Sequence, residues 1–228
     1  MPIPLLLLAV AAIASIGGAV VVACNWEKIH IALHGKRLAV LGERGVGKTS
    51  LITFLQSGTL PERYCQTGVP KKAAARRFQL EDLDINLKEM YDLSGDESAY
   101  GQWKIEVGKA DALLYLLRAD KIHAGNRSYE TRVKNDLRHL ADWLEEQDKR
   151  PHLLLVATHC DKVSELSNIS SGKYAGCVDK FRKLPVVSEL VERGGGNGQV
   201  RIVLGSLKNT PRTQNLVYSI FESLSHET

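Results

Sequence analysis

The segment Leu38-Ala39-Val40-Leu41-Gly42-Glu43-Arg44-Gly45-Val46-Gly47-Lys48-Thr49 decides the fold of this chain. It begins with an apolar run that predicts a buried strand, and residues 50–56 after it predict a helix. Between them, the pattern G-x-x-x-x-G-K-T is that of a loop that binds phosphate groups. Glycines let such a loop fold tightly and point its N–H groups at phosphate oxygens, at the positive end of the helix. The segment therefore predicts a phosphate site within an α/β fold.

The side chains that close this pattern predict its chemistry. Lys48 is expected to bridge the β- and γ-phosphates of a nucleotide, and the hydroxyl of Thr49 is expected to ligate Mg²⁺. A glycine-rich turn without a ligand is the alternative, and the strand before the loop and the helix after it disfavour that interpretation. The residues predicted to surround the phosphates are Gly42, Arg44, Gly45, Val46, Gly47, Lys48, Thr49 and Ser50.

Three further short motifs come at or after apolar stretches that predict strands. They are Asp92-Leu93-Ser94-Gly95 after 85–91, Thr158-His159-Cys160-Asp161 after 153–157, and Gly205-Ser206-Leu207-Lys208 after 200–204. The carboxylate of Asp161 can accept hydrogen bonds from both N1–H and N2–H₂ of guanine, a donor pair that adenine does not offer. The segment 158–161 resembles the guanine-binding motif of small GTPases, and this resemblance implies a guanine nucleotide as the ligand.

In this order the motifs resemble those of the Ras-like and Arf-like small GTPases. The resemblance covers residues 36–228 and implies a G domain of the P-loop NTPase fold, with a mostly parallel central sheet and helices on both faces. It also implies that Asp92 holds Mg²⁺ through water and that the N–H of Gly95 meets the γ-phosphate. Thr67 stands close to the place of the switch-loop threonine that completes the Mg²⁺ coordination, and Thr59 is its competitor.

The same resemblance implies a guanine site and GTP or GDP with Mg²⁺ as its ligands. His159 stands where the family has a lysine that packs along the base, and an imidazole could stack there instead. Lys208 is then expected to pack on the guanine, and Ser206 to support the loop. The implied base-binding residues are Thr158, His159, Asp161, Ser206, Leu207 and Lys208.

Two positions depart from the family pattern. Asp96 stands where Ras-like enzymes have a glutamine that orients the attacking water, and its negative charge is unfavourable near a γ-phosphate in the transition state. Arg44 replaces a small glycine of the loop; it could stabilise charge in cis, block the arginine of a partner, or remain solvated at the rim. Arg44, Lys48 and Asp96 are the candidate catalytic residues, and we expect slow intrinsic hydrolysis.

Helical patterns extend the predicted fold. Val133, Leu137, Leu140 and Leu144 share one face of an amphipathic helix, and a final helix is expected to start at Thr210-Pro211. Strands that alternate with such helices imply a parallel sheet that is covered on both faces. Residues 163–198 are longer than the family needs and end near a run of three glycines, which predicts a flexible surface insertion.

The charge pattern separates an uncharged head from this domain. The chain of 228 residues has 30 basic and 26 acidic side chains, a formal net charge of +4, and its first charged residue is Glu27. As a helix, residues 3–24 would span about 33 Å and cross a bilayer. A signal peptide, or a lipoprotein box at 21–24, would need a basic leader that is missing. Residues 25–35 are then a connector, and the basic residues after the span place the domain in the cytoplasm.

This plan of a single membrane span followed by a G domain is similar to that of the signal recognition particle receptor β subunits. Another family of membrane GTPases remains an alternative. A protein effector is an expected partner, whereas nucleic acid is not, because the basic residues at 71–77 carry no interleaved aromatic pattern. Two rival functions stay open, a non-hydrolysing GTP-bound scaffold and an ATP-using P-loop enzyme.

Overall fold

The computed structural model describes residues 36–61, 71–73, 76–80, 83–87, 89–92, 95–148, 150–169 and 171–225, with side chains omitted throughout 71–92. The predicted membrane helix at 3–24, the connector at 25–35 and Thr67 lie outside these residues. A search of the described part for a helix of bilayer-crossing length and hydropathy finds none.

The main sheet has six strands in the order β2-β5-β1-β6-β7-β8. Every pairing from β5 to β8 is parallel, and β2 runs antiparallel to β5 at the edge. The strand bounds are β1 Arg37–Leu41, β2 Lys71–Ala73, β5 Glu89–Asp92, β6 Ala112–Arg118, β7 His152–Thr158 and β8 Val200–Leu204. A separate hairpin pairs β3 (Arg76–Leu80) with β4 (Leu83–Leu87). The mostly parallel α/β architecture is confirmed.

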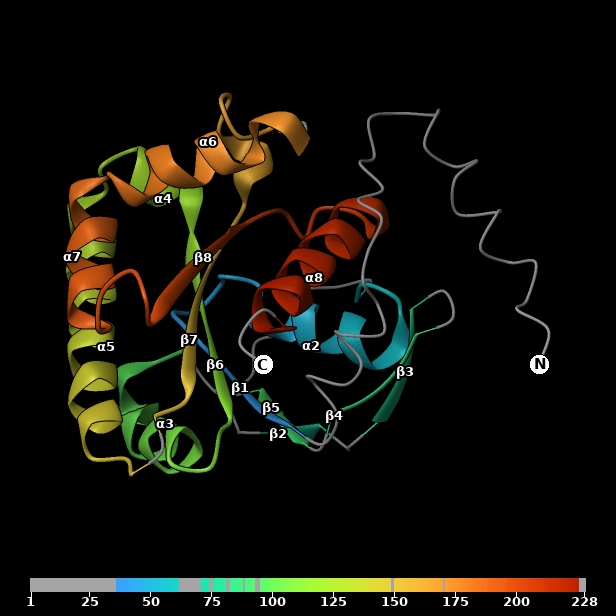
Figure 1. Cartoon of the computed structure of the whole chain (residues 1–228), viewed down its shortest axis with the longest axis vertical. Coiled ribbons are helices and arrows are strands. Elements are labelled where there is room, and N and C mark those ends of the chain that lie inside the picture. The colour runs from blue at the N-terminus through green and yellow to red at the C-terminus, as the bar shows by residue number, and fades with distance from the viewer. Residues whose placement is uncertain are drawn as a thin grey trace.

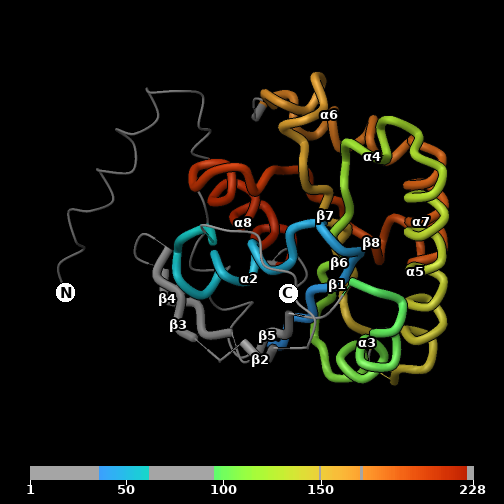
Figure 2. Tube along the Cα trace, turned by 180° about the vertical axis from the view of Figure 1, so that it is seen from behind, coloured from blue at the N-terminus to red at the C-terminus, as the bar shows by residue number. Residues whose placement is uncertain are grey.

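Helices cover both faces of this sheet because its central strands alternate their apolar side chains between two cores. One core joins the sheet to α3, α5 and α7, and the other joins it to α2 and α8. In Figure 1, α2 and α8 lie to the right of the sheet and α5 and α7 to its left, and the reverse view in Figure 2 shows the same layers. The helix bounds are α2 Lys48–Ser57, α3 Tyr100–Val107, α4 Ala119–His123, α5 Arg127–Glu145, α6 Ser171–Arg182, α7 Pro185–Arg193 and α8 Thr210–Ser225, with short 3₁₀ turns at 97–99 and 160–162.

Several local predictions are confirmed. The apolar positions predicted for the helix at 133–144 are buried on α5, and α8 begins at Thr210. β8 has the predicted bounds of 200–204. The single strand expected at 85–91 is instead divided between β4 and β5, which belong to different sheets.

The prediction of a flexible surface insertion at 163–198 is wrong. This segment forms α6 and α7, and α7 buries Val186, Val187, Leu190 and Val191. Pro185 stands at the first turn of α7, where its missing N–H costs nothing. α7 packs beside α5 in the core that covers one face of the sheet, so the segment contributes to the domain core.

Candidate functional site

The strands bring the predicted motifs to one edge of the sheet. β1, β5, β7 and β8 run in the same direction, and each ends at or directly before one motif. Ligands of open α/β sheets bind beyond the carboxyl ends of the strands. The backbone of Asp92 pairs with Val40 of β1, next to the phosphate loop. The fold therefore gathers four motifs that are far apart in the sequence.

The phosphate loop is shaped by its close contacts. Gly47 has a φ of +101°, in the left-handed region that glycine favours. A Cβ on Gly47 would lie 2.5 Å from Cδ1 of Leu207, so the side chain of Leu207 packs directly on this glycine. This contact joins the phosphate loop to the motif at 205–208. Because α2 starts at Lys48, its N-terminal N–H groups lie at the loop, where an anion is stabilised.

The side chain of Lys48 folds back over the first residues of this loop. This side chain is only 7% exposed, and its Nζ donates to the carbonyl oxygens of Gly42 at 2.9 Å and Glu43 at 3.1 Å. These oxygens orient the ammonium without neutralising its charge. A buried, oriented cation above a row of backbone N–H groups is suited to bind phosphate.

Thr158 connects the predicted guanine motif to the phosphate loop. Its buried hydroxyl lies 2.8 Å from the carbonyl oxygen of Val46, 3.1 Å from that of Leu117 and 2.9 Å from Nδ1 of His159. Both carbonyls can only accept, so the hydroxyl donates toward them and receives the hydrogen of Nδ1. His159 is therefore held as the Nδ1–H tautomer, at a left-handed φ of 60°.

The environment of His159 keeps its ring neutral at pH 7. Burial lowers the pKa of His159, and the positive charges of Arg118 and Lys162 lower it further. A neutral ring avoids a further positive charge beside the base site. In this state His159 offers a neutral aromatic ring at the position where Ras-like and Arf-like GTPases, which the motifs resemble, have a charged lysine.

Asp161 is supported by the neighbouring loop. The hydroxyl of Ser206 donates to Oδ1 of Asp161 at 2.5 Å and accepts from the backbone N–H of Lys208 at 3.1 Å. The N–H of Cys160 also donates to the carbonyl of Gly205 at 3.1 Å. These bonds join the two predicted base-binding loops into one unit, with the carboxylate of Asp161 held by Ser206.

The residues that depart from the family pattern lie at the rim of the site. Gly95 is buried, and a Cβ on it would lie 2.3 Å from the backbone nitrogen of Arg44, so the two motifs are in contact. The side chains of Arg44 and Asp96 are both exposed to solvent. Two of the three candidate catalytic residues, Arg44 and Asp96, are therefore exposed next to this contact, whereas the third, Lys48, is buried.

The predicted metal ligands are described only in part. Thr49 is half-buried in the first turn of α2, together with Ser50, which fits the place of a magnesium ligand beside Lys48. Thr67 and the side chain of Asp92 lie outside the described residues. Thr59, the competitor of Thr67, is exposed beyond the far end of α2, about 15 Å along the helix from Lys48. Thr59 is therefore a wrong candidate.

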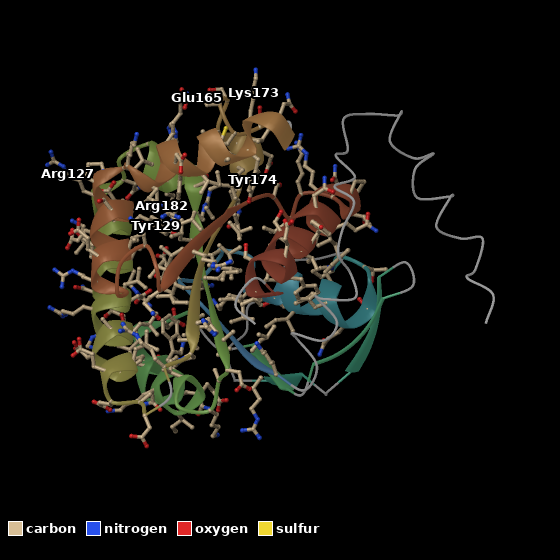
Figure 3. All side chains as sticks on the ribbon, in the orientation of Figure 1. Arg127, Tyr129, Glu165, Lys173, Tyr174 and Arg182 are labelled. Atoms are coloured by element: carbon tan, nitrogen blue, oxygen red, sulfur yellow. The ribbon has the colours of Figure 1, made fainter. Side chains whose placement is uncertain are left out.

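Tyr174 is a supporting residue that the sequence does not predict. It points from α6 toward β8, while Lys173 of the same helix points to the opposite side (Figure 3). Its hydroxyl donates to the carbonyl of Leu204 at 3.3 Å and accepts from the N–H of Leu204 at 2.9 Å. Burial raises the pKa of Tyr174, so the hydroxyl keeps its proton. α6 therefore holds the end of β8, directly before the loop at 205–208.

We expect Tyr174→Phe to lower the free energy of unfolding by about 1–2 kcal/mol, because both backbone groups of Leu204 lose a hydrogen-bond partner. Urea denaturation followed by circular dichroism measures the change. Lys173→Ala is the matched control, because this side chain is exposed on the same helix and should leave stability unchanged. Equal stability of wild type and Tyr174→Phe would contradict the assigned contact.

Comparison with protein-family models finds no matching family, and comparison with curated proteins finds no matching relative.

Proposed function

We propose that this chain is a GTP-binding protein with a G domain of the Ras and Arf type. The observation that carries the proposal is the hydrogen bond from Thr158 to the carbonyl of Val46, which joins residues 112 positions apart in the sequence. This bond puts the predicted guanine motif directly against the phosphate loop. A nucleotide with its phosphates beside Lys48 and its base beside Asp161 spans these two motifs.

The contacts of Asp161 support guanine as the base. Ser206 engages Oδ1 from one side, which orients the carboxylate. Adenine would face this acceptor without the N1–H and N2–H₂ donors of guanine, and an unpaired acceptor in a half-enclosed site is costly. The ATP-using enzyme is therefore the weaker candidate.

A competition experiment tests this choice. Labelled GDP bound to the full-length protein with Mg²⁺ is expected to be displaced by unlabelled GTP or GDP, and not by ATP or ADP at the same concentration. Displacement by adenine and guanine nucleotides at similar concentrations would contradict the proposal.

The residues present fit slow hydrolysis. Lys48 would hold the charge of the terminal phosphates, and Thr49, with Thr67 and Asp92, would hold Mg²⁺. When bound, Mg²⁺ would neutralise negative charge on the terminal phosphates. Asp96 is exposed and acidic, so it adds negative charge near the phosphate where the transition state requires positive charge. Arg44 is a second side chain of the loop, after Lys48, that could supply positive charge.

We expect intrinsic GTP hydrolysis below about 1 turnover per minute, because the water-orienting glutamine is absent. Release of inorganic phosphate under single-turnover conditions measures the rate. Asp96→Gln is expected to raise it, and Glu97→Gln at the next exposed position is the matched control. Faster turnover by the wild type, or no gain from Asp96→Gln, would contradict this assignment.

We further propose that the protein acts at a membrane, through the predicted span at 3–24, as a switch that recruits partners according to the bound nucleotide. A single membrane span followed by a G domain is similar to the plan of the signal recognition particle receptor β subunits. A non-hydrolysing GTP-bound scaffold is the second candidate, and the exposed, acidic Asp96 favours it. GTP that stays intact on the purified protein for hours would support the scaffold, and conversion to GDP would support the switch.

A further inference from the structure

A buried polar network lies behind the site, on the face of the sheet covered by α5. At its centre, the side chain of Asp136 is fully buried. Its Oδ1 accepts from Tyr100 Oη at 2.5 Å and from Arg132 Nε at 2.7 Å, and its Oδ2 accepts from Tyr115 Oη at 2.8 Å. These donors come from α3, α5 and β6. Such a satisfied network holds its members in one arrangement.

The three donors of this network keep their protons across the physiological pH range. Burial raises the pKa of Tyr100 and Tyr115, and the neighbouring Asp136 raises both further, so both phenols remain donors. Burial disfavours the charge of Arg132, but the hydrogen bond to Asp136 and the negative charge of that carboxylate together raise the pKa of Arg132 above its usual value. Arg132 is thus a permanent cation, 16% exposed, whose position Asp136 determines.

Arg132 extends this network to the phosphate site. Its Nη2 donates to the carbonyl oxygen of Gly95 at 2.8 Å. Gly95 in turn packs on the phosphate loop, since a Cβ on it would lie 2.3 Å from the nitrogen of Arg44 and 2.5 Å from the carbonyl carbon of Glu43. Arg132 therefore links helix α5 to the loop through a single residue.

The place of Gly95 along the loop indicates which phosphate it faces. The α- and β-phosphates of a nucleotide occupy the N-terminus of the helix, and the loop lysine reaches toward the β- and γ-phosphates. Here the ammonium of Lys48 lies against the carbonyl of Glu43, beside the Glu43–Arg44 peptide on which Gly95 packs. Gly95 is therefore expected to lie nearer to the γ-phosphate of a bound triphosphate than to its α- and β-phosphates.

We propose that Arg132 is a positioning residue that holds Gly95 against the phosphate loop and thereby lets the protein prefer a nucleoside triphosphate over a diphosphate. This inference rests on the proposed GTP-binding function. Thr158 and Asp161 serve the base, and Lys48 reaches the β-phosphate as well as the γ-phosphate. GTP and GDP share the base and the β-phosphate, so loss of Arg132 should affect the triphosphate selectively. The contact of Arg132 with Glu97, at 3.9 Å on an exposed carboxylate, contributes little.

The test compares Arg132→Ala and Arg132→Lys with the wild-type full-length chain, by calorimetric titration with GDP and with a non-hydrolysable GTP analogue in Mg²⁺. Both variants are expected to lose about tenfold in affinity for the GTP analogue and less than about twofold for GDP. This is the size expected when the N–H of Gly95 loses its charge-assisted hydrogen bond to the γ-phosphate. Lysine keeps a charge for Asp136, but its single nitrogen replaces two separate donors of arginine, to Asp136 and to Gly95. If Arg132→Ala does not fold, Arg132→Lys therefore still tests the proposal.

Two control variants separate positioning from general stability. Arg138→Ala changes an exposed arginine of the same helix and should leave both affinities unchanged. Tyr115→Phe removes one donor to Asp136 without touching Gly95, so it should lower the unfolding temperature and keep the ratio of affinities. Equal losses for GDP and the GTP analogue in Arg132→Lys, or no loss for either, would overturn the role of Arg132. Wild-type protein that binds neither guanine nucleotide would instead overturn the proposed function.

Discussion

Replacing Lys48 with alanine is expected to weaken the binding of both GTP and GDP by about 100-fold. Lys48 is buried, and its ammonium is oriented by the carbonyls of Gly42 and Glu43 at the mouth of the phosphate loop. A charge-assisted hydrogen bond in such a site contributes about 1.5–3 kcal/mol, and each 1.4 kcal/mol corresponds to tenfold in affinity. This range corresponds to about one to two decades in affinity, and the ion pair with the phosphates adds to it, so we expect a loss of about two decades.

Calorimetric titration with GDP in the presence of Mg²⁺ measures this effect. Lys109→Ala is the matched control, because Lys109 is an exposed lysine before β6, at the opposite edge of the sheet. It should bind GDP like the wild type. Thermal unfolding establishes that Lys48→Ala remains folded. A folded Lys48→Ala protein with less than about threefold weaker binding would mean that the loop does not hold phosphates.

Asp161→Asn is expected to change the preferred base from guanine to xanthine. The carboxylate of Asp161 accepts hydrogen bonds, and an amide in its place presents a donor to the N2 amino group of guanine, where xanthine has an acceptor oxygen. The mismatch should cost GTP about tenfold or more in affinity, and XTP should gain by a similar factor. Asn keeps an oxygen that accepts from Ser206, so the loop contact at 2.5 Å is retained.

Competition between GTP and XTP for the same labelled nucleotide measures this preference. Asp142→Asn, at an exposed position of α5, is the matched control and should keep the wild-type preference for GTP. If Asp161→Asn binds both nucleotides as the wild type does, Asp161 does not contact the base. An ATP-using P-loop enzyme predicts this unchanged binding.

The sequence predicts those parts of the fold that are encoded locally. The apolar run after Val200 and the pattern around Leu216 are enough for β8 and α8, because strand and helix periods are visible within a few turns. The motifs do not predict the central strand β6, although its seven residues are almost entirely apolar and buried. No glycine-rich motif follows it, so nothing marks its end. For α7 the reason is different, because the glycines at 194–196 favour a loop over the whole segment.

For the site, sequence predicts the residues that belong to contiguous motifs and misses those that support them from elsewhere. Tyr174 meets Leu204 across 30 positions, and Arg132 meets Gly95 across 37 positions. No local pattern encodes such contacts. One signal was available: Asp136 interrupts the apolar face that Val133, Leu137 and Leu140 form on α5, and a carboxylate there requires buried partners.

The most direct test of the central claim is the identity of the nucleotide that the protein retains. The full-length chain, purified in mild detergent, is incubated with equal concentrations of GTP and ATP in Mg²⁺, desalted and denatured, and the released nucleotide is identified by chromatography. We expect GTP or its product GDP, in close to equimolar amount with the protein. Recovery of ATP or ADP, or of no nucleotide, would contradict the account.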